Sequence, residues 1–414
     1  MKLEEIRKIE AQRLLPTYDR TQVHFVGGSG VWLRDENGVE YLDLLSGIGV
    51  NALGYGHPAI EKAIADQSKK LLHISNLFYH DGQARLAEKL ASTTGLDRAF
   101  FCNSGTEAWE AALKLARAYS QLRRREGHPA GTKILAMDNS FHGRTMGSLS
   151  TTHKQKYREP FAPLVPGVEF VRWNDVADLH AKFSPEVCAV CIEVLQGEGG
   201  LRSVSPEFLQ AARELTEQSG SLLLLDEIQS GIGRTGDWCA YQHYGVKPDM
   251  TTLAKPLAGG LPLGALLCTN EVARAMEPGL HGTTFGGGPL ACAVALAVFK
   301  TIEDENLLAH VREVGAYFEN SLQELKARHD AIVEVRGRGL MLGLELNDVE
   351  VAKAVAAEML AQKIIINRTS DVVLRFLPPF LIQEEHVDRA IEALDAALSK
   401  ALEPALTGGV PHGN

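Results

Sequence analysis

The stretch SLLLLDEIQSGIGRTG, residues 221–236, decides the fold of this chain. Its first five residues form an almost entirely apolar run, which is typical of a parallel strand buried on both faces. Asp226 follows at once, so its carboxylate is expected at the carboxyl edge of the sheet, where open α/β folds bind ligands. The remaining residues are polar or glycine and are typical of a loop. The sequence therefore predicts an α/β fold with a ligand site beyond this strand.

A lysine follows a second apolar segment. Residues 248–254 read as a short strand, and Lys255 comes next, before a turn rich in glycine and proline. A lysine in apolar surroundings loses solvation of its ammonium form, which lowers its pKa and makes its amine a nucleophile. Alone, Lys255 would most often be a surface residue and Asp226 a helix cap or an ion-pair partner. Together they match the needs of pyridoxal phosphate, a lysine for its aldehyde carbon and an acid for its pyridine nitrogen.

A candidate phosphate site lies at a turn from strand to helix. Residues 100–102 read as a strand end and residues 107–117 as a helix, with Ser104, Gly105 and Thr106 at the junction. Small polar residues at a helix start direct N–H groups and hydroxyls at an anion, and the helix dipole helps to hold it. An ordinary capping box has the same residue types. The chain has no G-x-G-x-x-G after a strand and no G-K-[ST], so a dinucleotide-binding oxidoreductase and a nucleoside triphosphatase lose their main support.

With these motifs, the chain resembles the class III pyridoxal-phosphate-dependent aminotransferases, most closely the acetylornithine aminotransferases. The resemblance runs from about Leu14 to about Leu398. It is carried by six stretches in the order of the family, Asn103–Glu107, Phe141–Thr145, Gln196–Gly200, Leu225–Gly236, His281–Gly287 and Leu374–Phe376.

The resemblance implies a fold-type I architecture, with a large α/β domain that holds a mostly parallel sheet flanked by helices and a smaller α+β domain. The alternation of strand-like and helical segments between about residues 60 and 300 independently favours such a sheet. The expected division is an N-terminal segment, 1–58, that packs with the small domain, a large cofactor-binding domain, 59–305, and a small domain, 306–406. The tail 407–414 is rich in glycine and proline and is expected to be disordered.

The resemblance also assigns roles around the cofactor. Lys255 and Asp226 would be catalytic, and Phe141 would stack on the flat ring. Thr284 would reach the phosphate across a subunit interface, which implies a homodimer with shared sites. The full set of expected cofactor-binding residues is Ser104, Gly105, Thr106, Phe141, Asp226, Glu227, Ile228, Gln229, Lys255 and Thr284.

The implied substrates explain two arginines and a glutamate. N-acetylornithine offers its terminal amine, so its carboxylate lies far from the ring, whereas glutamate has one near and one distant carboxylate. The resemblance implies that Arg144 binds the distal carboxylate and Arg375 the proximal one, with Thr283 touching the substrate. Removing one partner of a buried ion pair costs about 3–5 kcal/mol, and Glu198 would pair with Arg375 whenever the proximal carboxylate is absent.

The implied reaction moves the terminal amine of N-acetylornithine to 2-oxoglutarate. It gives N-acetylglutamate semialdehyde and glutamate, a step of arginine biosynthesis. Another class III aminotransferase that acts on succinylornithine, ornithine or 4-aminobutyrate stays open as an alternative. Gly47 stands where ornithine aminotransferases carry a tyrosine for the free α-amine, which favours an acylated substrate, although a glycine there also suits a turn.

Trp109 departs from the family pattern, which commonly has asparagine there. It falls on the first turn of the helix after the phosphate site, and two roles are open. It could pack at a subunit interface, or it could narrow the cofactor pocket.

Composition favours a soluble cytoplasmic enzyme that binds neither nucleic acid nor membranes. The net charge is −10, and hydrophobic residues make up 45% of the chain, enough for a large core. An acidic balance argues against nonspecific binding to nucleic acid or membrane surfaces. The chain has no apolar run long enough to span a bilayer, and the charged segment Met1–Lys8 lacks the apolar region of a signal peptide. The six cysteines are expected to be reduced core thiols without a metal. A noncatalytic protein of this fold would not need both Lys255 and Asp226.

Overall fold

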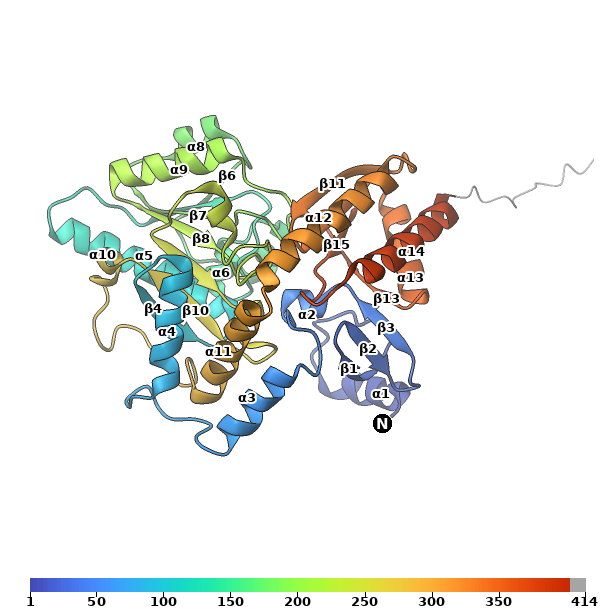
Figure 1. Cartoon of the computed structure of the whole chain (residues 1–414). Coiled ribbons are helices and arrows are strands. Elements are labelled where there is room, and N and C mark those ends of the chain that lie inside the picture. Colours follow the sequence, from blue (N-terminus) through green and yellow to red (C-terminus); the bar gives the residue numbers. More distant parts are fainter. Residues whose placement is uncertain (403–414) are drawn as a thin grey trace, which may run out of the picture.

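The fold is organised around a seven-stranded sheet in the strand order β4-β10-β9-β8-β7-β5-β6. The computed structural model describes residues 1–402, and Figure 1 shows this sheet on the left of the molecule. All pairs are parallel except those of β10, which runs antiparallel to both neighbours. The mostly parallel sheet is confirmed. Its strands are β4 (Arg98–Cys102), β5 (Lys133–Met137), β6 (Val168–Val171), β7 (Val187–Ile192), β8 (Leu222–Asp226), β9 (Met250–Leu253) and β10 (Gly264–Cys268).

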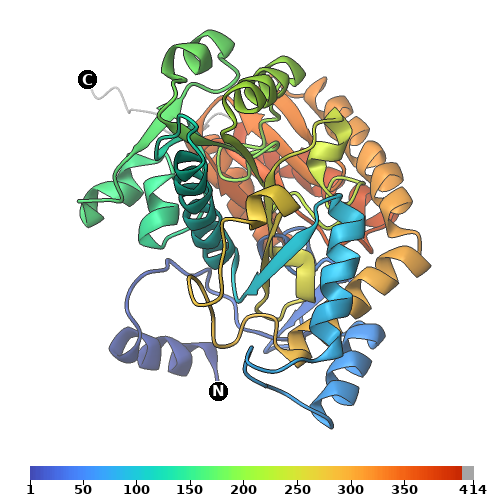
Figure 2. The same ribbon diagram turned by 90° about the vertical axis from the view of Figure 1, so that its left-hand side faces the viewer.

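The leucine run of β8 is buried on both faces, as its sequence predicts. Leu222 and Leu224 belong to the apolar cluster beneath helix α5 (Gly105–Arg125). Leu223 and Leu225 belong to the main core cluster on the other face, which includes apolar residues of helix α9 (Pro206–Ser219). Successive side chains of a strand point to opposite faces, so helices on both sides cover the strand. Figure 2 shows α5 as the long teal helix that runs alongside the sheet.

Two smaller sheets join the two ends of the chain. One has the order β1-β2-β3-β13 and the other β11-β12-β15-β14. Strand β13 pairs in parallel with β3, which brings Ile364 opposite Leu42. The N-terminal segment therefore packs with the C-terminal part, at the right of Figure 1, while the domain bounds 1–58, 59–305 and 306–406 stay predictions. The strands are β1 (Phe25–Ser29), β2 (Trp32–Asp35), β3 (Glu40–Asp43), β11 (Ile332–Arg338), β12 (Met341–Leu346), β13 (Ile364–Ile365), β14 (Asn367–Thr369) and β15 (Val373–Phe376).

The other helices surround these sheets. Helix α1 buries none of its residues. The predicted tail 407–414 lies outside the described residues. The helices are α1 (Leu3–Arg13), α2 (Ser46–Gly49), α3 (Pro58–Ser68), α4 (Asp81–Thr94), α6 (Met146–Ser150), α7 (Gln155–Arg158), α8 (Val176–Lys182), α10 (Asn270–Ala273), α11 (Pro289–Asp304), α12 (Leu307–Lys326), α13 (Val349–Ala361) and α14 (Glu384–Leu402), with the 3-10 helices η1 (Glu159–Phe161), η2 (Ala240–Tyr244) and η3 (Lys255–Ala258).

The six cysteines are buried and form no disulfide, which fits their predicted role as core thiols. Within residues 1–402, no helix is long and apolar enough to cross a bilayer. The same residues hold no group of histidine, cysteine and carboxylate side chains that could bind a metal ion.

Candidate active site

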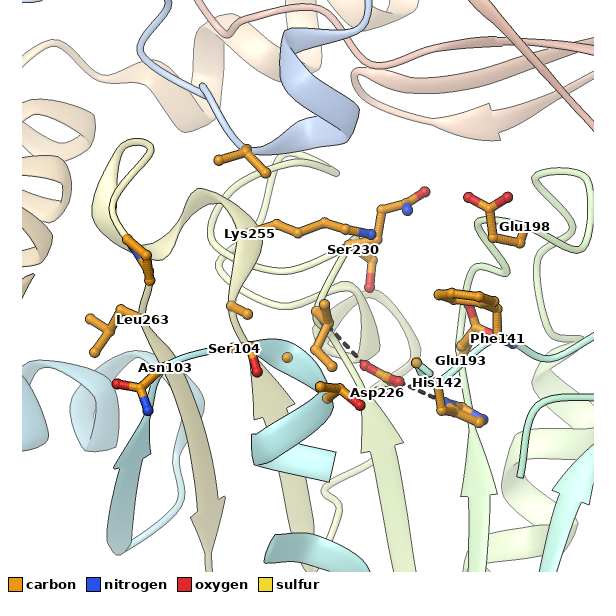
Figure 3. Close-up of a pocket in the computed structure, with 18 of the residues that line it drawn as sticks. Asn103, Ser104, Phe141, His142, Glu193, Glu198, Asp226, Ser230, Lys255 and Leu263 are labelled. Atoms are coloured by element: carbon orange, nitrogen blue, oxygen red, sulfur yellow. Dashed lines mark hydrogen bonds and ion pairs between the residues drawn. The ribbon is translucent and has the colours of Figure 1, made fainter. Parts of the chain in front are cut away.

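Three polar side chains meet where neighbouring strands of the large sheet end. Glu193 follows β7, Asp226 ends β8, and Lys255 follows β9 by two residues. These strands are parallel, so their carboxyl ends lie at one edge of the sheet. All three side chains line one cavity of about 340 Å³, which Figure 3 shows.

Asp226 is held rigidly at the base of this cavity. It is only 5% exposed. Its Oδ1 accepts hydrogen bonds from the backbone N–H of Ile228 at 3.0 Å and from the Thr252 hydroxyl at 3.1 Å. Its Oδ2 lies 2.6 Å from Nδ1 of His142, a contact that Figure 3 marks with a dashed line. A carboxylate fixed by three donors has one orientation toward a ligand above it.

Lys255 extends across the cavity, with Phe141 and Glu198 beyond its amine in Figure 3. Burial, the largest cause, and the nearby charge of Arg375 together lower the pKa of Lys255 to about 8, against the raising effects of Glu198 and Asp226. Desolvation disfavours the ammonium form. An appreciable fraction of the amine is therefore uncharged near neutral pH, as a nucleophile requires.

The turn from β4 into α5 forms a tight anion cradle. Ser104 is the N-cap, and its hydroxyl accepts from the N–H of Glu107 at 3.2 Å. A Cβ on Gly105 would lie 2.8 Å from the side chain of Ile228, so only glycine fits there. The hydroxyl of Thr106 meets that of Ser148 at 2.7 Å. The first N–H groups of a helix have no intrahelical acceptor, so those of Gly105 and Thr106 are available to an anion.

Phe141 is positioned by a buried carboxylate, that of Glu193. The N–H of Phe141 donates to Oε1 of Glu193 at 2.8 Å, and Oε2 accepts from the N–H of Gly197 at 3.2 Å. Burial raises the pKa of Glu193 to about 7. Glu193 thus sets the backbone that carries the aromatic ring.

Glu198, a half-buried residue that lines the cavity, forms an ion pair with the buried Arg375. Arg375 on β15 is 1% exposed, and its Nη1 lies 2.5 Å from Oε1 of Glu198. The same nitrogen lies 3.4 Å from Oε1 of Gln229, and Nε donates to Asn367 at 3.1 Å. Burial would raise the pKa of the Glu198 carboxyl, but Arg375 holds it below its usual value. The structure thus places the two residues as their predicted pairing requires.

Several residues expected at the site lie outside the cavity of their own chain. Glu227 is fully buried and accepts from Ser230 and from the N–H groups of Ala240 and Tyr241, so its side chain braces the loop instead of facing the cofactor site. Arg144 is exposed, and its guanidinium stacks 3.6 Å from the ring centre of Tyr157.

Thr283 and Thr284 also lie outside this cavity. Thr283 contacts Asn103 at 3.2 Å through its hydroxyl, and Thr284 is exposed.

The structure gives Gly47 a backbone role. Gly47 has φ 63° and ψ 36° and is followed by a second left-handed residue, Ile48. Such a conformation favours glycine whatever the substrate is, so the glycine alone does not decide for an acylated amine.

Trp109 has neither of the two roles left open by the sequence. It is fully buried within its own chain, so it is unavailable to a subunit interface, and it does not line the cavity. It packs against the ring of His142 instead.

Sequence reasoning gave His142 and Glu193 too little weight. For Glu193 a signal was present, since it follows the apolar run Val187–Ile192 as Asp226 follows its leucines. His142 had no such signal, because its contact with Asp226 joins residues 84 positions apart in the chain.

Pyridoxal phosphate fits these residues. The cradle leaves no room for a side chain at Gly105, and a Cβ on Gly143 would lie 2.4 Å from the hydroxyl of Thr106. The cavity volume suits a small ligand. Gly105 and Thr106 would hold the phosphate, Asp226 the ring nitrogen, Phe141 a ring face and Lys255 the aldehyde carbon.

Comparisons with known proteins agree with this site. The family model described as aminotransferase class III matches residues 16–398. An acetylornithine aminotransferase from Aquifex aeolicus is 48% identical over 92% of this chain and 98% of its own length. One from Methanocaldococcus jannaschii is 45% identical over 95% of this chain and 97% of its own.

Solved structures share the whole fold. An ornithine aminotransferase from Toxoplasma gondii, described with partial occupancy of pyridoxal phosphate at its active site, is 32% identical and has a TM-score of 0.92. The match covers 97% of this chain and 95% of that one. The chain belongs to the class III aminotransferases and is a pyridoxal-phosphate-dependent transaminase.

Proposed function

We propose that this enzyme transfers the terminal amine of N-acetylornithine to 2-oxoglutarate, as a step of arginine biosynthesis. The observation that carries the proposal is the ion pair between the buried Arg375 and the half-buried Glu198, which lines the cavity that holds Lys255. A transaminase that alternates between a substrate without a proximal carboxylate and glutamate, which has one, needs an arginine with a replaceable partner. The names of the two acetylornithine aminotransferases above support the same substrate.

Each residue has a defined task in this reaction. Bound pyridoxal phosphate supplies a ring that withdraws electrons from the carbon bearing the amine. Nζ of Lys255 accepts the proton of that carbon and later returns one, while Asp226 keeps a negative charge beside the ring nitrogen. Arg375 binds the proximal carboxylate of glutamate through two parallel hydrogen bonds, and Arg144 binds the distal carboxylate of either substrate.

We propose a homodimer, and an exposed apolar patch supports it. Leu77, Phe78 and Tyr79 are exposed, and so is Phe285, whose ring lies 5.2 Å from that of His73. Monomers rarely expose such a contiguous patch. Thr284 precedes Phe285 in the chain and is exposed as well, and the resemblance to the family implies that a second copy brings its Thr284 to this cavity.

The cytoplasm is the proposed compartment. All six cysteines are buried and unpaired, and a chain with thiols in its core suits a reducing compartment. The acidic charge also supports small-molecule substrates over nucleic acid or membrane surfaces.

The test of the substrate compares catalytic efficiency with 2-oxoglutarate as the acceptor. N-acetylornithine should exceed succinylornithine, ornithine and 4-aminobutyrate. A clear preference for free ornithine would show that the proposed substrate is wrong.

The test of the ion pair follows each half-reaction in a single turnover. Arg375→Ala should slow the glutamate half by about a hundredfold, since a bidentate charged contact is worth about 3 kcal/mol, and should slow the N-acetylornithine half far less. Arg368→Ala is the matched control, because Arg368 lies on neighbouring β14 and the only hydrogen bond of its guanidinium among the described residues goes to the carbonyl of Asp371. Equal losses in both halves would contradict the role of Arg375.

A further inference from the structure

Trp109 is a large buried side chain that the reaction described above does not use. Its indole Nε1 donates to the hydroxyl of Thr151 at 2.8 Å, and that hydroxyl donates to the carbonyl of Ser148 at 3.0 Å. The indole N–H is therefore fully satisfied, and the bond fixes the ring within the gap between α5 and α6. A tryptophan held in this way presents one flat face in a single orientation.

That face lies on the imidazole of His142. The two ring centres are 3.8 Å apart, and the ring planes differ by only 4°. The imidazole has one hydrogen bond, from Nδ1 to Asp226 at 2.6 Å, while its Nε2 is buried without a partner in the described residues. One hydrogen bond and one stack thus define the ring position. A half turn of the ring about its Cβ–Cγ bond would place a carbon against Asp226.

His142 presents Nδ1, and not a ring carbon, to Oδ2 of Asp226. A carboxylate oxygen accepts hydrogen bonds, so Nδ1 is the donor in this contact. The orientation of the imidazole therefore decides whether Oδ2 has a donor.

We propose that Trp109 is a positioning residue that holds His142 in register with Asp226, and so sets the affinity of this enzyme for the nitrogen end of its cofactor. The other two donors to Asp226, the N–H of Ile228 and the hydroxyl of Thr252, both bind Oδ1. His142 is the donor to Oδ2. The stack therefore holds in place the donor to one of the two carboxylate oxygens. This proposal needs the cofactor but is independent of the substrate proposed above.

The test uses a cofactor analogue with carbon in place of the ring nitrogen. Trp109→Leu keeps an apolar side chain but removes the flat face, and Trp109→Phe keeps a ring. Dissociation constants of the holoenzymes are measured by equilibrium dialysis with pyridoxal phosphate and with the analogue. For Trp109→Leu we expect about a tenfold or greater loss of affinity for pyridoxal phosphate, the size of one lost hydrogen bond to a charged group. The analogue should lose less than about threefold, and Trp109→Phe should lie close to the unmodified enzyme for both ligands.

A spectroscopic measurement supplies an independent readout. The Nδ1 proton of His142 should give a low-field proton resonance in the holoenzyme, identified by its loss in His142→Gln. Trp109→Leu should lose or broaden this resonance, and Trp109→Phe should retain it. Retention of the resonance together with an unchanged affinity in Trp109→Leu would overturn the proposal.

A second variant covers the case in which Trp109→Leu does not fold. Thr151→Val removes the hydroxyl that anchors the indole and leaves the core volume almost unchanged. Its affinity for pyridoxal phosphate should fall by about twofold to fivefold, with the analogue unaffected. An equal loss for both ligands, in this variant or in Trp109→Leu, would mean that Trp109 only supports the fold.

Discussion

At the scale of single residues, the site depends on how burial changes the chemistry of one amine. The first prediction concerns the pH at which the amine of Lys255 loses its proton. Because its pKa is lowered to about 8, the fraction of uncharged amine should rise as the pH increases from 7 to 9, with a midpoint near 8. Competitive acetylation at a series of pH values, with the labelled peptide quantified by mass spectrometry, measures this midpoint in the cofactor-free protein. Exposed lysines ordinarily titrate near 10.4, so a midpoint above about 10 for Lys255 would contradict the structure.

Lys255 and Asp226 could be predicted from the sequence because their signal is local. Each follows an apolar strand of a parallel sheet, and that pattern alone places both at one sheet edge. Glu193 obeys the same rule. The neighbours that tune these groups could not be predicted from the local pattern, because His142 and Arg375 come near them only in the folded chain. The resemblance to the family, not the local pattern, brought Arg375 and Glu198 together.

At the scale of elements, the turn from β4 into α5 forms the anion cradle. The second prediction concerns Gly105 in this turn. A Cβ there would lie within 3.1 Å of three side-chain atoms of Ile228. Gly105→Ala should therefore weaken binding of pyridoxal phosphate by about tenfold or more, as overpacking costs about 1–3 kcal/mol. Equilibrium dialysis measures the affinity.

The matched control removes the atoms that clash. Gly105→Ala combined with Ile228→Ala should regain most of the affinity relative to Ile228→Ala alone, because each of the close contacts is to Ile228 beyond its Cβ. If the double variant does not regain affinity for pyridoxal phosphate, Gly105 is needed for its backbone conformation and not for the room that its missing side chain leaves.

The type and place of most elements could be predicted, whereas their long-range pairing could not. The helix after residue 104 and the strands around residues 100, 190, 224 and 251 follow from apolar runs and turn residues. The two-residue strand β13 carries no such signal, since its existence depends on β3, more than 300 residues earlier. Trp109 illustrates the same limit, because its partner His142 lies on another segment.

At the scale of the whole molecule, the third prediction concerns Arg234, which joins the large sheet to both ends of the chain. It is fully buried, and its guanidinium donates to the carbonyls of Leu340 at 3.2 Å and Pro378 at 2.5 Å and lies 3.5 Å from the hydroxyl of Ser46. Arg234→Ala should lower the free energy of unfolding by about 2–6 kcal/mol, since each carbonyl left without a donor costs about 1–3 kcal/mol. Thermal unfolding of the holoenzyme measures the effect. The exposed Arg338 is the control, and Arg338→Ala should stay within about 0.5 kcal/mol.

The fourth prediction concerns the assembly, because Thr284 is exposed in its own chain and is proposed to serve the site of a second copy. Thr284→Asp would place a carboxylate beside a phosphate that carries about −1.5 to −2 charge, so this homodimer should bind the cofactor poorly. Lys255→Ala should be inactive. In a mixed dimer of the two variants, one site combines an intact Lys255 with an intact Thr284 from the other subunit. Coexpression, separation by two affinity tags and assay at limiting cofactor should therefore recover about half of the normal activity per dimer. If Thr284 served its own chain, no site of the mixed dimer would be intact, and its activity would not exceed that of the Thr284→Asp homodimer.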